Sequence, residues 1–147
     1  MKVWAYVHPE LNILCCALLP EAVPQSVEYV ELEVATLDDV ILDNFGQIRV
    51  KTEAEKLAEE KQRKLDELKR YVATLLEQTD YIITKIAEAQ IQNNIAEVEA
   101  LMQKYATQLQ QREAIRRWSE QMKQAIRNAK SLEELRRIEI RYEGVAA

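Results

Sequence analysis

The spacing of hydrophobic residues changes near residue 51. Over residues 1–50 apolar side chains form short runs or alternate with polar ones, a pattern typical of β-strands. From Thr52 onward they recur every three or four residues, which is the period of an amphipathic helix. We therefore predict an α+β fold, with a small antiparallel β head over residues 1–51. Residues 52–147 are predicted to form a long, coiled-coil-like antiparallel helical hairpin and a short C-terminal helix.

The head is expected to contain four or five short strands. Residues 3–7 and 13–19 predict a hairpin, because a Pro-containing turn separates two apolar runs. Residues 27–34 alternate and predict another strand. Residues 40–50 read as a second hairpin around an Asn-x-Gly turn. About fifty residues form only a marginal core, so the head is expected to need further packing.

Two capping boxes mark the helical part. Thr52 followed by Glu55 predicts the start of the first helix, and Ser131 followed by Glu134 predicts the start of a short last helix. That last helix is expected to run to about Tyr142 and to end at Gly144.

Between the two boxes the chain predicts two helical arms, over residues 53–91 and 95–130. The three polar residues between the arms form the loop of the hairpin. Thr79 and Asp80 predict a restart within the first arm, because both residue types favour the N-cap. The step from Leu109 to Ile115 breaks the heptad and predicts a stutter in the second arm.

A two-helix hairpin leaves part of a wide apolar stripe uncovered. The head is too small to cover a hairpin of this length, so we expect the stripe to meet other copies of the chain. A homo-oligomer is predicted, with a trimer as the favoured copy number. The residues predicted to form this oligomer or partner interface are Leu68, Val72, Leu75, Ile82, Ile86, Val98, Met102, Tyr105, Leu109 and Trp118.

Charge and composition argue against most catalytic chemistry. The net charge of -5 disfavours general affinity for nucleic acid or anionic membranes. His8 stands alone, and Cys15 and Cys16 are adjacent, which is not a metal-ligand spacing. With 2 glycines in 147 residues a Gly-rich phosphate loop is not available. We predict no enzyme, with no catalytic, cofactor-binding or metal-binding residues.

The chain shows no targeting pattern. Met1 and Lys2 lead directly into a strand pattern rather than into the apolar region of a signal peptide. The longest apolar run, residues 13–19, is too short to span a bilayer. We expect a protein that is not secreted by a signal peptide and has no membrane partner.

Residues 75–88, with the sequence LLEQTDYIITKIAE, resemble a stretch of small tail-associated proteins of tailed bacteriophages and prophages, including tail-fibre assembly proteins. Residues 112–118 and 129–135 are similar to the downstream part of such proteins. In that resemblance Thr79 and Asp80 cap the second half of the first arm and Tyr81 packs near the kink. Lys85 and Glu88, three residues apart, are expected to pair.

The resemblance implies a non-enzymatic phage or prophage tail-associated protein, an oligomeric structural or adaptor component that acts through helix packing. A phage tail or fibre protein is then a candidate partner. The expected location is the virion tail, or the host cytoplasm during assembly. One alternative is a tail-fibre assembly chaperone that transiently binds a fibre or tail protein. Another is a cytoplasmic helical adaptor that binds nucleic acid through the basic residues between Arg112 and Arg141.

Overall fold

A computed structural model describes residues 1–144 and has the predicted α+β fold. The chain forms two compact units, Met1–Lys56 and the residues from Leu57 onward. The division lies one helical turn beyond the predicted boundary at residues 51 and 52, because the first turn of the first helix is held by head residues. There Arg49 pairs with Glu55, and Lys56 lies 3.5 Å from Asp39.

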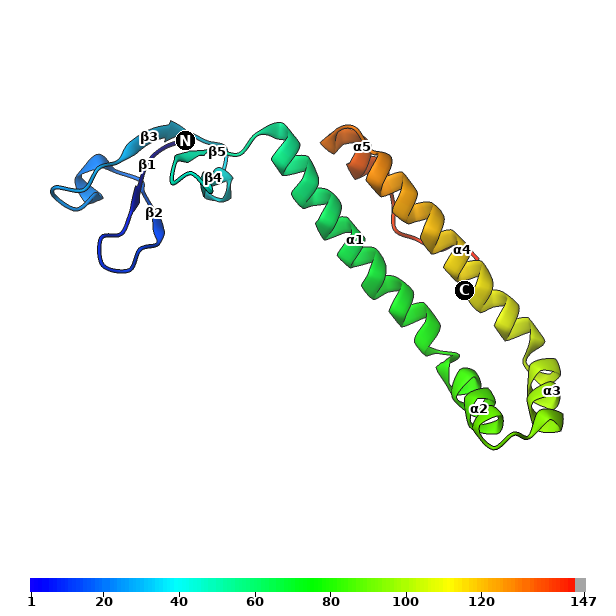
Figure 1. The fold of residues 1–147 in the computed structure, drawn as a ribbon. Coiled ribbons are helices and arrows are strands. Elements are labelled where there is room, and N and C mark those ends of the chain that lie inside the picture. The colour runs from blue at the N-terminus through cyan, green and yellow to red at the C-terminus, as the bar shows by residue number, and fades with distance from the viewer. Residues whose placement is uncertain (145–147) are drawn as a thin grey trace. The chain divides into compact units, whose positions relative to one another are not determined.

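The head contains two antiparallel sheets (Figure 1). The first has three strands in the order β2-β1-β3, with β1 at the centre, and the second pairs β4 with β5. The predicted pairing of the first two strands is confirmed, with Ala5 opposite Cys16. The strands are β1 (Lys2–Val7), β2 (Leu14–Ala17), β3 (Val30–Glu33), β4 (Val40–Leu42) and β5 (Ile48–Val50).

Strand β3 is shorter than the alternating pattern predicted. Only Val30–Glu33 is strand, whereas residues 27–29 lie outside it. Strand β1 continues to Val7, yet it pairs with β3 only from Lys2 opposite Glu33 to Ala5 opposite Val30, so residues 27–29 are not paired with it. Alternation alone does not reveal where the pairing of two strands ends.

The core of the head lies between the two sheets. Val3 and Ala5 of β1 are completely buried and cluster with Val34 and Val40. Partly buried side chains from both sheets pack against this cluster; they are Leu14, Cys16, Leu32, Ile48 and Val50. This small core stabilises the head through apolar burial, and both cysteines are free.

The predicted hairpin around Gly46 is confirmed. Gly46 has a φ of +77°, a conformation that glycine adopts at little cost. The Asp43 carboxylate accepts hydrogen bonds from the backbone N–H groups of Phe45 and Gln47, both at 2.9 Å. These bonds, led by the one from Gln47, lower the pKa of the Asp43 carboxyl. An Asp side chain that closes its own turn in this way is a common hairpin device.

The second unit is a helical hairpin, whose arms run side by side in opposite directions (Figure 1). Four helices form the arms, and a fifth follows them. They are α1 (Glu53–Glu77), α2 (Asp80–Ile91), α3 (Ile95–Lys104), α4 (Ala106–Asn128) and α5 (Leu132–Arg137). Asn93 has a φ of 55° in the loop between α2 and α3, and Asn94 accepts a hydrogen bond from Glu97 N–H, so this loop is confirmed.

Both capping boxes are confirmed. The Thr52 hydroxyl accepts from Glu55 N–H and the Glu55 carboxylate accepts from Thr52 N–H, each at 3.2 Å. At α5 the Ser131 hydroxyl accepts from Glu134 N–H at 3.1 Å. The Glu134 carboxylate accepts from Lys130 N–H at 2.8 Å. These bonds satisfy backbone donors that lack partners in the first turn of a helix.

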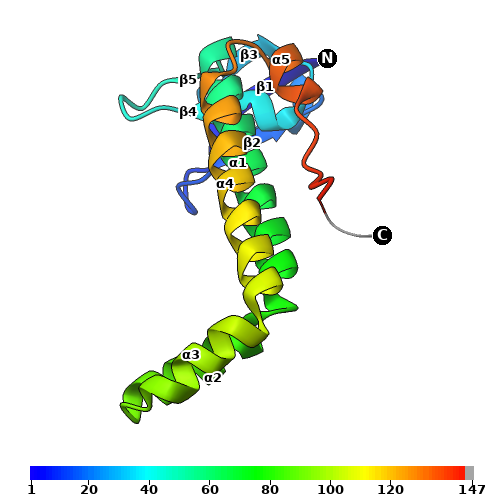
Figure 2. The ribbon, with the colours of Figure 1, turned by 90° about the vertical axis from the view of Figure 1, so that its right-hand side faces the viewer.

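Each arm of the hairpin is interrupted once. The first break, between α1 and α2, lies at the predicted restart, but the Thr79 side chain makes no capping bond to α2. Its hydroxyl donates instead to the carbonyl of Leu76 at 3.3 Å. The second break lies at Tyr105, not between Leu109 and Ile115, where α4 is continuous. Figure 2 shows the α2–α3 part of the hairpin turned away from the line of α1 and α4.

The predicted stutter between Leu109 and Ile115 does not interrupt α4, and the inward position there is not vacant. Arg112 occupies it and is buried, with 6% of its surface exposed. A search for apolar spacing cannot recognise an arginine as a core residue, since arginine is rarely buried without partners. The position therefore read as a gap in the heptad.

Helix α5 ends at Arg137, earlier than the predicted end near Tyr142. The chain then runs back along the hairpin, where Ile138 and Ile140 pack against its core. The backbone N–H of Tyr142 donates to the Tyr71 hydroxyl at 3.1 Å, and its ring lies 5.3 Å from the Trp118 ring. These contacts along the arms hold the segment extended, so the periodic apolar residues there do not continue a helix.

Candidate interaction surfaces

The ten residues predicted to form an interface between chains lie mostly inside this one chain. Leu68, Ile82 and Tyr105 are buried, with 0%, 0% and 8% of their surfaces exposed. Partly buried members of the set are Val72, Leu75, Ile86, Val98, Leu109 and Trp118. Met102 alone among the ten is exposed, at 51%. The stripe is covered to a large degree by the hairpin's own packing. A substitution in it is therefore expected to destabilise the fold of the single chain, whether or not the chain assembles.

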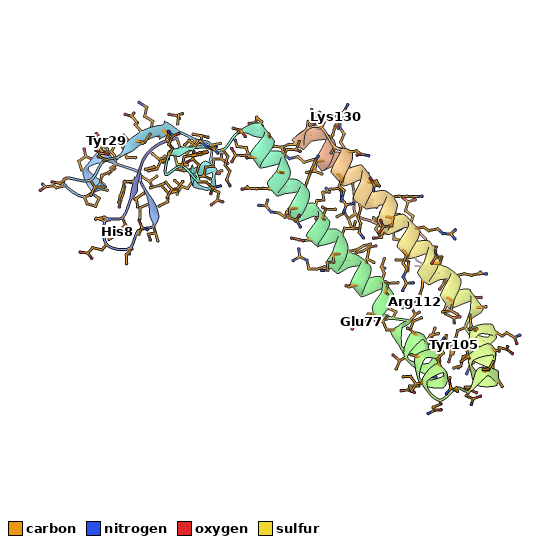
Figure 3. The ribbon with its side chains drawn as sticks, in the orientation of Figure 1. His8, Tyr29, Glu77, Tyr105, Arg112 and Lys130 are labelled. Atoms are coloured by element: carbon orange, nitrogen blue, oxygen red, sulfur yellow. The ribbon has the colours of Figure 1, made fainter. Side chains whose placement is uncertain are left out.

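These residues belong to two separate apolar clusters. One lies between α1, α4 and α5 and is built on Leu68, Ile126 and Leu135. The other lies between α2 and α3 and is built on Ile82 and Leu101 together with Tyr105. Figure 3 shows Arg112 at the level of the helix break, with Glu77 on the facing arm. The two parts of the hairpin therefore have their own cores, and the buried guanidinium of Arg112 lies near the helix break between them.

Arg112 joins the broken ends of the first arm. Its Nη1 donates to the Leu76 carbonyl at 2.8 Å, to the Thr79 hydroxyl at 2.9 Å and to the Asp80 carboxylate at 3.0 Å. Leu76 lies in the last turn of α1, where carbonyls lack helical partners, and Asp80 begins α2. Its Nε is buried and has no hydrogen-bond partner among the described residues. Because Arg112 is committed to these contacts, it is not available to bind phosphates.

Lys85 does not pair with Glu88 in the described structure. Its Nζ lies 3.4 Å from the Tyr105 hydroxyl and 5.6 Å from the centroid of the Tyr81 ring. Lys104 Nζ also lies over the Tyr105 ring, 5.2 Å from its centroid. The hydrogen bond from Lys85 is the main cause that lowers the pKa of the Tyr105 phenol. The group is a cation–aromatic cluster beside the second helix break.

The closed end of the hairpin carries the most exposed aliphatic side chains of the helical unit. Ile91 ends α2 and is 81% exposed, and Ile95 begins α3 and is 72% exposed. Met102 lies seven residues after Ile95, on the same side of α3. We call Ile91, Ile95 and Met102 the hairpin tip. The hydrophobic pattern predicts Ile91 and Ile95 at the ends of the arms but carries no signal that their side chains face solvent.

A shallow cavity adjoins the hairpin tip. It has a volume of about 260 Å³ and is lined by Gln90, Asn93, Asn94, Ile95 and Val98. The positive φ of Asn93 turns the chain tightly here. The loop therefore leaves one side of Ile95 and Val98 uncovered, and an apolar side chain of a partner could enter beside them.

The junction of β5 and α1 holds a group of paired charges. Arg49 lies 3.3 Å from Asp43, and its guanidinium also donates to both carboxylate oxygens of Glu55, the second at 3.2 Å. The bond from Arg49 is the largest cause that lowers the pKa of Glu55 from 4.5 to about 2, followed by the Thr52 backbone N–H. This group ties the first turn of α1 to the head and has no free nucleophile or proton donor.

The residues considered for chemistry in the head have structural partners. His8 Nδ1 accepts from the backbone N–H groups of Glu10 and Leu11, at 3.2 and 3.1 Å, which makes it a turn residue. Burial raises the pKa of the Cys16 thiol. Within residues 1–144 no three His, Cys, Asp or Glu side chains group closely enough to hold a metal ion. None of the helices described there is both long and apolar enough to cross a bilayer.

No protein-family model, curated protein or solved structure matches this chain. Residues 75–88 contain the first helix break and part of the core between α2 and α3.

Proposed function

We propose that this chain is a non-enzymatic phage or prophage tail-associated protein, an adaptor that joins other tail proteins through helix packing. The observation that carries the proposal is the hairpin tip, where Ile91, Ile95 and Met102 are exposed at 81%, 72% and 51%. Most of the stripe is used within the chain, so these side chains are the most exposed apolar helical surface left for another protein, and Tyr81 and Ile83 of α2 are less exposed. Apolar side chains gathered at one place on a surface favour contact with a partner.

Residues 75–88 support the tail assignment through their resemblance and through what they do in the fold. Thr79 and Asp80 receive the guanidinium of Arg112, from the second segment that shares the resemblance. The two segments thus meet at the first helix break, where Arg112 donates hydrogen bonds to Thr79 and Asp80. A motif that holds the two arms of the hairpin together supports a role in which a rigid helical hairpin links other proteins.

The exposure of the hairpin tip also supports the alternative, a tail-fibre assembly chaperone. A permanent structural part buries its apolar surface in the assembled particle, whereas a chaperone needs that surface available before assembly. Both roles use the same residues, and they differ in the lifetime of the complex.

Light scattering across a dilution series tests the role of the tip. A discrete oligomer that survives dilution supports a structural adaptor, and Ile95→Glu with Met102→Glu is expected to dissociate it. Gln103→Glu, an exposed neighbour on α3, is the control and should leave the mass unchanged. A monomer or a dilution-sensitive dimer supports the chaperone. Proteomic analysis of purified phage particles and assembly intermediates tests the tail assignment, and absence of the chain from both would refute it.

A further inference from the structure

The exposed edge of the three-stranded sheet points to a second binding site, which does not use helix packing. Strand β3 lies at the edge of the sheet, because the strand order is β2-β1-β3. Its register with β1 is fixed by the backbone N–H of Val34, which donates to the Met1 carbonyl at 2.9 Å. In an antiparallel pair the hydrogen-bonded positions alternate. Val30 and Leu32 therefore bond to β1, and the backbone groups of Glu31 and Glu33 point away from it.

The outward backbone groups of Glu31 and Glu33 have no hydrogen-bond partner within the described residues. Both residues are exposed. An unpaired row of N–H and C=O groups along a strand is a template for another strand. No helix or loop hydrogen-bonds to this row among residues 1–144.

Strand β5 has an open edge of the same kind. Asp43 N–H donates to the Gln47 carbonyl at 2.9 Å, and Lys51 N–H donates to the Asp39 carbonyl at 2.7 Å. By the same alternation, Arg49 bonds to β4, and the backbone groups of Ile48 and Val50 point away from β4. A cavity of about 530 Å³ lies between two segments of the head. One is residues 27–30, which lead into β3, and the other is residues 46–48, which lead into β5. Val7 completes its lining.

The charges around β3 decide what kind of strand fits. Glu31 and Glu33 share one face of the sheet with Lys2 and Trp4, and Val30 and Leu32 share the other face with Val3 and Ala5. On the side of β1, Lys2 Nζ lies 3.2 Å from Glu31, and the Met1 amine lies 2.6 Å from Glu33. A strand on the open side meets the same alternation of carboxylates and apolar side chains.

A second copy of β3 does not suit this edge. Antiparallel pairing of two β3 strands would bring Glu31 and Glu33 of one copy close to the same residues of the other, and like charges across a strand pair are destabilising. Glu28, exposed and also at the cavity, adds to this repulsion. The occupant that the charges favour is a strand with basic residues.

We propose that the head binds an extended segment of a partner protein by strand addition at β3. The segment alternates basic residues, which face Glu31 and Glu33, with apolar residues, which enter the cavity beside Val30 and Ile48. Main-chain hydrogen bonds supply the affinity and the alternate side chains supply the selectivity. This site does not depend on the hairpin tip or on the tail assignment, so either can fail without the other.

The test uses the full chain, labelled with ¹⁵N, and a capped synthetic peptide of sequence Lys-Val-Lys-Val-Lys-Val. Binding is expected to slow hydrogen exchange at the amides of Glu31 and Glu33, while the Leu32 amide, already bonded to β1, stays unchanged. A peptide with Glu in place of Lys is expected to bind about tenfold more weakly or worse. Unchanged exchange at Glu31 and Glu33 with saturating Lys peptide would overturn the proposal.

One peptide variant and two protein variants separate strand addition from simple charge attraction. A Lys peptide with N-methyl groups on alternate amides keeps its charge but cannot form the strand ladder, so its binding should be lost; equal binding would overturn the proposal. In the protein, Glu31→Pro removes the outward N–H, which edge strands tolerate, together with the carboxylate that pairs with Lys2, and should abolish binding. Glu31→Gln keeps that N–H and should retain binding with a smaller preference for Lys over Glu peptides. Trp4 fluorescence checks that the head of each variant remains folded.

Discussion

The buried guanidinium of Arg112 provides a direct test of how the hairpin is held together at its first break. Replacing it with methionine, as Arg112→Met, keeps a long apolar side chain but removes every donor. The Leu76 carbonyl and the Thr79 hydroxyl then lose a charged donor at 2.8 and 2.9 Å. The position itself is 6% exposed, so water can replace these bonds only in part.

The magnitude follows from these contacts. A hydrogen bond to a charged group contributes about 1.5–3 kcal/mol when buried. We expect Arg112→Met to lower the free energy of unfolding of the hairpin by about 2–3 kcal/mol, less than the sum of the bonds, because methionine recovers apolar packing. The ion pair contributes little to this value, since the Asp80 side chain is 59% exposed. Asp80→Asn should therefore cost less than about 1 kcal/mol.

Urea denaturation followed by Trp118 fluorescence measures this change. Trp118 lies in α4, and a Trp4→Phe background removes the signal of the head. Arg116→Met, at an exposed position of the same helix, is the matched control and should stay within about 0.5 kcal/mol of the parent. If Arg112→Met destabilises the hairpin no more than Arg116→Met, the guanidinium does not hold the break.

Three further predictions follow from the same structure. Ile82→Asp places a carboxylate at a fully buried position and should lower the free energy of unfolding by about 4 kcal/mol or more. The helical circular dichroism signal of the single chain should then be lost. Gly46→Ala should cost about 1 kcal/mol, from backbone strain at a φ of +77° alone, because an added Cβ meets no atom within 4 Å; Gly46→Asn should cost less. The folded-state pKa of Glu55 is lowered from 4.5 to about 2, so its stabilising effect is present above pH 4.5 and is lost as the pH falls toward 2. Acid titrations followed by Trp4 fluorescence should show that loss in the parent and not in Glu55→Gln.

Each of these predictions has a result that would contradict it. Intact helical signal in Ile82→Asp would mean that the α2–α3 core is not closed within one chain. Equal stability of Gly46→Ala and the parent would show that the turn relaxes to another conformation. Parallel acid titrations of Glu55→Gln and the parent would remove the Arg49–Glu55 pair as a cause of acid sensitivity.

Local signals in the sequence determined which elements form and where several of them begin. The boxes at Thr52 and Ser131 need only residues three apart, and the tight turns at Gly46 and Asn93 need only residues that tolerate a positive φ. Such interactions are complete within one turn of chain, so the pattern of residues is sufficient to recognise them.

The tertiary structure decided which surfaces are buried and which remain for a partner. The stripe that suggested a large interface is covered mainly by the facing arm. The most exposed apolar side chains that remain are Ile91, Ile95 and Met102, and Tyr81 and Ile83 are exposed to a smaller degree. Arg112 is a core residue because its hydrogen-bond acceptors lie at the break of the first arm, and the second break, at Tyr105, was not predicted. Strand β3 likewise has an open edge because it pairs with β1 on one side only, in the strand order β2-β1-β3. Burial and pairing of this kind arise from residues far apart in the chain, and periodicity within one segment does not record them.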